Sequence, residues 1–159
     1  MIKTIGVDPG LAATGVGIVT GISQQVDSFS YGCIKTSPKT LLPNRLDQIF
    51  SKLQTLLKNE KPDVMFVEDI FSLNRYPKSG ITLGKVTGVI LLAGFQNSVP
   101  VSEIPVREAK KILTGSGNAN KIQLEQSVRH FLNINIPIRP YHASDALALA
   151  IIGLFRFSS

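Results

Sequence analysis

Residues 2–20 read IKTIGVDPGLAATGVGIVT, and the kind of fold that we expect follows from this stretch. The apolar pattern from Ile2 to Asp8 predicts a buried strand, and Pro9-Gly10 predicts a turn after it. Gly15 to Thr20 and Phe29 to Thr36 predict two further strands. Because no helical pattern separates the three strands, we expect them to form an antiparallel meander.

The rest of the chain predicts helices alternating with strands. Between Pro43 and Pro62, apolar residues recur at helical spacing, so this segment predicts an amphipathic helix. The elements expected after it are a buried strand over Val64 to Val67, a helix over Thr82 to Gln96, a short strand over Val99 to Ile104, helices over Val106 to Leu113 and Lys121 to Leu132, and a last helix from about Ser144 to Phe155. This order predicts a single α/β domain over residues 1–159.

The composition bounds the class of protein. Apolar residues make up 43% of the chain, which predicts a packed core, and Cys33 is the only cysteine, which excludes a disulfide framework. No apolar run reaches the roughly 18 residues that a membrane-spanning helix needs, and the first residues lack a signal-peptide pattern. We therefore expect a cytoplasmic protein that does not enter a membrane.

The glycines after the first strand raise two nucleotide-binding hypotheses. A dinucleotide-binding fingerprint needs a helix directly after its glycines, whereas Gly15 and Gly17 continue as a strand. Gly6 to Gly10 resembles the first phosphate loop of actin-like ATPases and sugar kinases. Those proteins bind nucleotide between two such domains, and this chain is long enough for only one. Both hypotheses are disfavoured.

Four side chains with metal-binding chemistry stand where predicted strands and helices begin or end. Asp8 closes the first strand, and Glu68 follows the strand Val64 to Val67. His142 and Asp145 precede the apolar run of the last helix. A carboxylate at the end of a buried strand is costly unless a positive charge neutralises it. If the four side chains converge, they form a site for divalent metal ions, which points to phosphate chemistry.

Two-metal hydrolysis suggests a role for each of these side chains. The two ions lie roughly 3.5–4 Å apart and share a ligand. We assign the shared position to Asp8, because the end of a central strand is rigid. Glu68 would hold one ion. Asp145 and His142 would hold the other, since a spacing of three can place them on one helix face, and neutral imidazole also suits Mn²⁺.

Basic side chains are concentrated between residues 71 and 121. Within a net charge of +6, this concentration predicts contacts with a phosphate backbone, although a solvated basic surface is the alternative. Beside a metal site, it favours a polyanionic substrate. The stretch has only Glu103 and Glu108 as acids, and its seven basic residues are Arg75, Lys78, Lys85, Arg107, Lys110, Lys111 and Lys121.

Three motifs follow one another along nearly the whole chain. They are Gly6-Val7-Asp8-Pro9-Gly10 with Thr14-Gly15-Val16-Gly17, Val67-Glu68-Asp69-Ile70-Phe71, and His142-Ala143-Ser144-Asp145 running on to Ala150. Together they resemble the RuvC family of Holliday junction resolvases. The resemblance implies an RNase H-like fold, with a five-stranded mixed sheet flanked by helices on both faces. It also implies a homodimer that cuts two opposing strands of a four-way DNA junction with Mg²⁺ or Mn²⁺, and a branch-migration helicase complex is a further partner to consider.

The resemblance carries over residue by residue to the acidic cluster. Asp8, Glu68 and Asp145 match the family's catalytic carboxylates. His142 falls where many members have a fourth carboxylate and others have histidine.

The resemblance also implies contacts with DNA. Lys110 and Lys121 match basic residues that approach the scissile backbone, and Lys121 would stabilise charge in the transition state. Phe71 matches an aromatic residue used near the junction centre. The DNA-binding residues that we expect are Phe71, Arg75, Lys78, Lys110, Lys111 and Lys121.

Some interpretations stay open. Phe71 is explained equally well as a core residue and as a base-stacking wedge, and His142 also fits an ordinary exposed residue. For the whole protein, one alternative is an RNase H-like nuclease that acts on RNA or an RNA–DNA hybrid, which paired active sites in a dimer would argue against. The other is a non-catalytic junction-binding protein, which the intact acidic set argues against.

The helix predicted over Thr82 to Gln96 offers a dimer interface. A junction has two symmetric scissile strands, and a domain with one metal site needs a second copy to cut both. We therefore expect this helix to meet its copy across a two-fold axis. Gly84 and Gly88 would permit close approach there, although packing within the monomer is the alternative for these glycines. The apolar residues that the helix offers are Val89, Leu91, Leu92 and Phe95.

Overall fold

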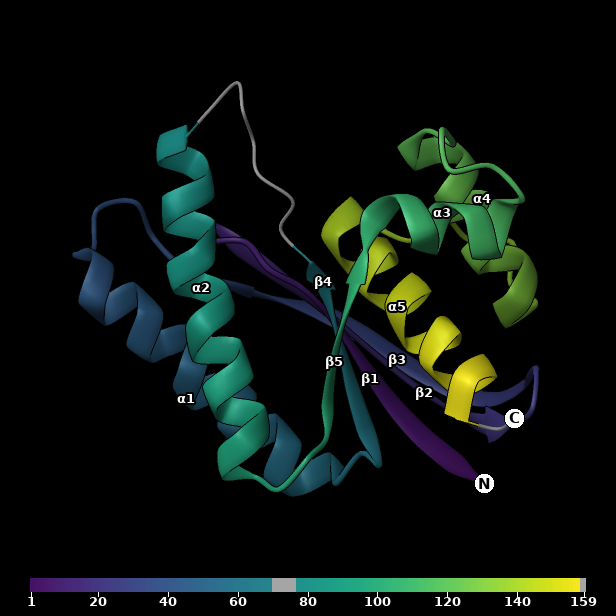
Figure 1. Cartoon of the computed structure of the whole chain (residues 1–159), viewed down its shortest axis with the longest axis horizontal. Coiled ribbons are helices and arrows are strands. Elements are labelled where there is room, and N and C mark those ends of the chain that lie inside the picture. Colours follow the sequence, from purple (N-terminus) through teal and green to yellow (C-terminus); the bar gives the residue numbers. More distant parts are fainter. Residues whose placement is uncertain (70–76, 158–159) are drawn as a thin grey trace.

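The structure is a computed structural model and describes residues 1–69 and 77–157 of the chain. Within these residues, five strands form one sheet in the order β3-β2-β1-β4-β5 (Figure 1). Because β1 is the middle strand of this order, Asp8 stands at the end of the central strand, as expected. The strands are β1 Ile2–Asp8, β2 Ala13–Ile22, β3 Gln25–Lys35, β4 Val64–Asp69 and β5 Val101–Pro105.

The strand pairing makes the sheet mixed and confirms the meander. β1 pairs with β2 and β2 with β3 in antiparallel fashion, whereas β4 is parallel to β1 and β5 is parallel to β4. The register places Val7 of β1 opposite Val67 of β4. Parallel strands end at the same edge of a sheet, so the residues that follow this pair, Asp8 and Glu68, come together at that edge.

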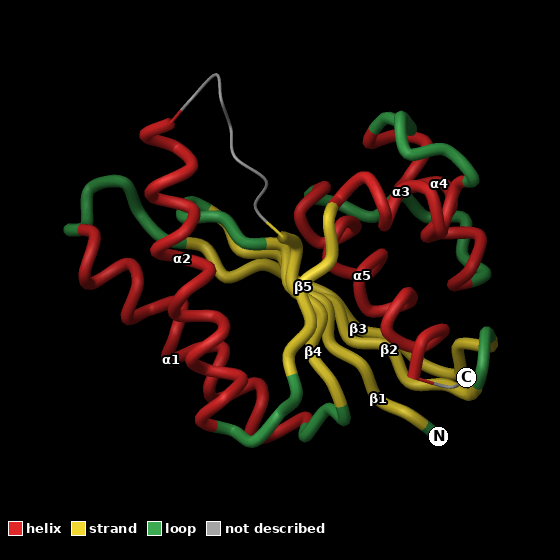
Figure 2. The backbone as a smooth tube through the Cα atoms, in the orientation of Figure 1, coloured by secondary structure: helices red, strands yellow, loops and turns green. Residues whose placement is uncertain are grey.

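Helices cover both faces of the sheet, and each face has its own apolar core (Figure 2). Successive side chains of a strand point to opposite faces, so Met65 belongs to one core and Phe66 to the other. The predicted α/β architecture is confirmed. The helices on one face are α1 Leu42–Glu60 and α2 Pro77–Gln96, and those on the other are α3 Val106–Thr114, α4 Lys121–Leu132 and α5 Tyr141–Phe157.

Glycines in β1 and β2 form the surface on which α5 lies. A Cβ atom at Gly6 would overlap with the backbone of Ala146, and one at Gly15 would overlap with the carbonyl group of His142. Gly6 and Gly15, which raised the two nucleotide-binding hypotheses, therefore serve close packing between helix and sheet. Because these glycines have no side chains, the first turns of α5 can lie against the end of β1 and the start of β2.

Three elements begin three or more residues earlier than the sequence pattern predicts. α2 begins at Pro77 rather than Thr82, since proline suits the start of a helix, where its missing N–H would have no partner. α5 begins at Tyr141, so the two site residues near its start lie inside the helix. β3 begins at Gln25, where mostly polar residues pair with β2 without the alternation that marks a half-buried strand.

α2 leaves much of its apolar surface uncovered. Leu92 and Phe95 are 47% and 80% exposed. A Cβ atom at Gly84 or Gly88 would meet no atom within 4 Å, so these glycines are not needed for packing inside the chain. Among the described residues, Lys78–Gln96 is the one helix long and apolar enough to cross a membrane, by length and composition only. This helix meets the criterion by mean hydropathy and not by an unbroken apolar run, because Lys85 and several polar residues and glycines interrupt it.

Candidate active site

The four predicted metal-binding residues converge where β1 and β4 end and α5 begins. Asp8 is buried, with 4% of its surface exposed, whereas Glu68, His142 and Asp145 are partly exposed. Parallel pairing of β1 with β4 brings the first two together, and the glycine surface beneath α5 brings the other two over them. The sequence motifs are far apart along the chain, but they form one site.

His142 and Asp8 form the closest contact of the site, with 2.6 Å between Nδ1 and Oδ2. This hydrogen bond raises the pKa of His142; burial lowers it in part, and the negative charge of Asp8 raises it further. With a neutral ring and the proton on Nδ1, the imidazole donates to Asp8. Its Nε2 lone pair is then free for a cation.

Glu68 and Asp145 resist ionisation in this site. Burial, followed by hydrogen bonding to Asp8 and repulsion from it, raises the pKa of Glu68 to about 9. Burial and repulsion from Asp8 raise the pKa of Asp145 to about 6. For both groups burial is the largest cause, and the negative charge of Asp8, which Lys121 offsets only in part, adds to it.

The donor set fits a hard divalent cation. Carboxylate oxygens are the ligands that Mg²⁺ prefers, and an imidazole nitrogen adds tolerance for Mn²⁺. Among residues 1–69 and 77–157, however, no group of three or more His, Cys, Asp or Glu side chains is already gathered around one ion position. The side chains instead meet in pairs, since Asp8 is hydrogen-bonded to His142 and to Glu68. A bound cation would offset the part of the pKa shifts of Glu68 and Asp145 that comes from neighbouring negative charge.

Two lysines add positive charge to the site. Lys121 lowers the pKa of Glu68 and of Asp145, and Lys110 lowers that of Asp145, although burial and the neighbouring carboxylates outweigh both lysines. Lys110 lies on α3 and Lys121 is the first residue of α4, so both approach from the same side of the sheet as α5. Their expected contact with the scissile backbone stays a prediction.

A capping box fixes the start of α4 and with it Lys121. The side chain of Asn120 accepts a hydrogen bond from the Gln123 N–H at 2.9 Å, and the side chain of Gln123 accepts one from the Asn120 N–H at 2.9 Å. This pair was missed in the sequence. An Asn three residues before a Gln at the start of an amphipathic segment is the signal that identifies it.

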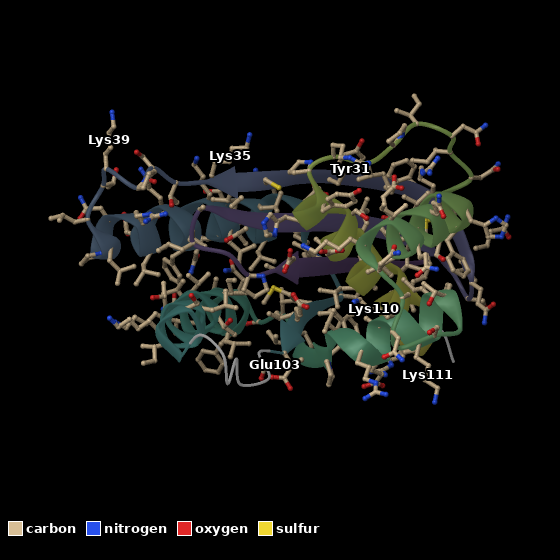
Figure 3. The ribbon with its side chains drawn as sticks, turned by 90° about the horizontal axis from the view of Figure 1, so that it is seen from above. Tyr31, Lys35, Lys39, Glu103, Lys110 and Lys111 are labelled. Atoms are coloured by element: carbon tan, nitrogen blue, oxygen red, sulfur yellow. The ribbon has the colours of Figure 1, made fainter. Side chains whose placement is uncertain are left out.

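The two other predicted DNA-binding lysines that the structure describes, Lys78 and Lys111, lie on the surface. Lys111 is exposed on α3 (Figure 3), and Lys78 is exposed at the start of α2, beside Leu11 of the β1–β2 turn. Figure 3 also shows Lys111 at the edge of the molecule away from β3. Phe71 and Arg75 lie outside the described residues, so their roles stay predictions.

Known proteins are similar to this chain over most of its length. The family described as crossover junction endodeoxyribonuclease RuvC matches residues 4–153. The chain belongs to the RuvC family. The RuvC of Syntrophomonas wolfei is 40% identical over 159 residues, which covers 99% of this chain and 92% of that relative. The RuvC of Endomicrobium trichonymphae is 38% identical over 148 residues, which covers 92% of this chain and 77% of that relative.

The fold agrees with solved RuvC structures. T. thermophilus RuvC in complex with Holliday junction substrate superimposes with a TM-score of 0.90 at 28% identity, covering 99% of this chain and 96% of that one. The RuvC resemblance and the RNase H-like fold expected from the sequence are both confirmed.

Proposed function

We propose that this protein is a structure-selective endonuclease that resolves four-way (Holliday) DNA junctions by hydrolysing phosphodiester bonds on two opposing strands. The observation that carries the proposal is the convergence of three carboxylates and a histidine, flanked by Lys110 and Lys121, in a member of the RuvC family. The relatives named above are crossover junction endodeoxyribonucleases, and the T. thermophilus neighbour holds Holliday junction substrate.

The acidic cluster would hold Mg²⁺, with two ions per site and Mn²⁺ as a substitute. Asp8 would be shared between the ions, Glu68 would complete one ligand set, and Asp145 with His142 would complete the other. When bound, the cations would neutralise the carboxylates and supply a water that is acidic enough to act as a nucleophile near neutral pH. The bond from His142 Nδ1 to Asp8 would orient the imidazole.

The lysines would bind and orient the scissile strand. Lys121 would stabilise the charge that develops on the phosphate oxygens while the P–O bond to the leaving sugar oxygen breaks. Lys110 would contact the same backbone. Flanking phosphates would bind Arg75, Lys78 and Lys111, and Phe71 would stack on an unpaired base near the junction centre.

Paired cuts would require a homodimer, and α2 is the surface that supports this part of the proposal. Its exposed Leu92 and Phe95 provide apolar contact area, and the open space beside Gly84 and Gly88 admits a second helix. A dimer through α2 would also account for an apolar helix that the single chain leaves largely uncovered. A cytoplasmic setting and a branch-migration helicase as a further partner belong to the same proposal.

One cleavage assay tests the proposal. Purified protein is incubated with a labelled mobile four-way junction, a linear duplex and an RNA–DNA hybrid, with and without Mg²⁺. We expect paired nicks in the junction only, and only with metal. Preferential hydrolysis of the hybrid would favour the RNase H-like alternative, and tight junction binding without cleavage in Mg²⁺ or Mn²⁺ would favour a non-catalytic binder.

A further inference from the structure

Asp8 and Glu125 are the two buried carboxylates in the described part of the chain. Asp8 belongs to the acidic site, but Glu125 lies on α4, is 2% exposed and has no place in the chemistry proposed above. An isolated buried carboxylate is strongly unfavourable, so a protein that retains one gains something from its contacts.

Glu125 binds the segment that leads into the active-site helix. Its Oε1 accepts the backbone N–H of Ile138 at 2.8 Å and lies 3.8 Å from Nη1 of Arg139. Ile138 itself is fully buried. Residues 133–140, which connect α4 to α5, have no regular secondary structure, so such contacts determine where α5 starts.

Two arginines add contacts between Glu125 and the connection from α4 to α5. Arg129 Nε lies 3.0 Å from Glu125 Oε1, and its Nη1 donates to the Asn135 carbonyl at 3.2 Å. The Arg139 guanidinium lies 4.3 Å from the ring centroid of Tyr141, the first residue of α5. A continuous set of contacts thus runs from α4 through residues 135–139 to the first residue of α5.

The same helix carries Lys121, one turn before Glu125. Lys121 interacts with Glu68 and with Asp145, so α4 contributes a cation to the acidic site at its start and holds the connection to α5 one turn later. The spacing between Lys121 and the first turns of α5 therefore depends on how Glu125 holds Ile138.

We propose that Glu125 is a positioning residue for cleavage. Through its bond to Ile138 and its pairs with Arg129 and Arg139, it holds the start of α5 at the distance from Lys121 that the reaction needs. This inference rests on the proposed function, because it assigns the phosphate contact to Lys121 and the metal ligands to α5. A misplacement of about 1 Å costs as much as 100-fold in rate, so a contact distant from substrate can control the chemical step.

The test compares Glu125→Ala with Val128→Ala, a cavity-forming change in the apolar core of the same helix. Both variants should lose stability, but only Glu125→Ala removes the contacts that hold residues 133–140. At a temperature where both are folded, we expect single-turnover cleavage of a saturating four-way junction to fall roughly tenfold or more for Glu125→Ala, with junction affinity within about twofold of wild type. Val128→Ala should cleave at the wild-type rate. Equal rates in the two variants overturn the proposal.

Two further measurements keep the outcome decisive. Glu125→Gln keeps an oxygen that accepts from Ile138, so it should recover most of the lost rate; a glutamine variant as slow as the alanine variant overturns the role of that bond.

Hydrogen exchange at residues 138–145 tests the same contact without a cleavage assay. It should be faster in Glu125→Ala than in Val128→Ala, and unchanged exchange overturns the proposal. A wild-type protein that does not cut junctions would instead refute the proposed function.

Discussion

Each carboxylate of the site is expected to be needed for cleavage but not for binding. Asp8→Asn, Glu68→Gln and Asp145→Asn each remove a charged metal ligand while retaining shape. Mutation of residues that only orient the ligands of a metal site costs about 10–100-fold in metal affinity or activity. We therefore expect each variant, which changes a ligand itself, to lose at least about 100-fold in junction cleavage. Affinity should persist, because phosphate contacts come from basic side chains. Gel-shift and cleavage assays on the same preparations measure both. Near-wild-type cleavage by any variant, with metal present, removes that residue from the site.

Glu68 should also lower the stability of the metal-free protein as pH rises. Its pKa in the folded state, raised from 4.5 to about 9, lies above the unfolded value, so the folded protein favours the protonated form. The free-energy cost of ionising Glu68 in the folded state does not affect stability below about pH 4.5, and it grows as the pH rises toward 9. In a chelating buffer, Glu68→Gln should therefore gain on the order of 1 kcal/mol over wild type at pH 8, a few degrees in Tm, and nothing at pH 4.

Thermal unfolding at pH 4, 6 and 8 measures this effect. Saturating Mg²⁺ should raise the Tm of the wild type at pH 8 and reduce the advantage of Glu68→Gln. Tm differences that do not vary with pH would show that Glu68 ionises as easily in the folded chain as in the unfolded one.

His142 should make metal binding depend on pH. The hydrogen bond to Asp8 raises the pKa of His142, so the ring stays protonated, and unable to ligate, to a higher pH than an isolated imidazole. Mn²⁺ affinity, followed by calorimetry between pH 6 and 8.5, should increase with pH in the wild type. His142→Asp should retain cleavage, flatten this dependence and shift preference from Mn²⁺ toward Mg²⁺. An unchanged metal profile in both His142→Asp and His142→Ala means that the imidazole is not a ligand.

At the level of elements, the contact between α5 and the sheet depends on glycine. A Cβ atom at Gly15 would overlap with the backbone of His142, which cannot move without displacing α5. Gly15→Ala should therefore destabilise the fold by roughly 1–3 kcal/mol and slow cleavage by displacing two site residues. Gly32→Ala is the control, because a Cβ atom there meets nothing within 4 Å. Denaturant unfolding compares them, and equal stability of the two variants would contradict this account of α5 packing.

Local sequence signals predicted the elements whose patterns are strong. The buried run of β1 and the turn after it placed Asp8, and helical periodicity placed α1, because burial of one face dictates the spacing of apolar residues. The order of the three motifs along the chain then indicated which residues form the acidic site. Contacts between segments distant in sequence were not predictable in this way. Glu125 looks like an ordinary helix-surface acid until Ile138 and Arg139 fold over it, and the polar start of β3 becomes a strand only by pairing with β2.

For the whole molecule, the decisive prediction concerns assembly. One chain carries one acidic site, and α2 exposes apolar side chains that a monomer leaves in water. We expect a dimer at micromolar concentration, so light scattering should give twice the monomer mass of 17.2 kDa. Leu92→Glu should weaken the dimer at least about tenfold, because it would bury an unpaired charge at the interface. Ile22→Glu, at a position with 57% exposure compared with 47% for Leu92, is the control and should leave the mass unchanged.

Cleavage products connect this assembly to function. A dimer on a symmetric junction cuts both opposing strands within the lifetime of one complex, whereas separate monomers nick them independently. On a supercoiled plasmid carrying an extruded cruciform, the wild type should release linear product directly. Leu92→Glu should accumulate the nicked circle first. A monomer mass for the wild type, both free and on junction DNA, would remove α2 as an interface and would favour a nuclease that cuts single strands.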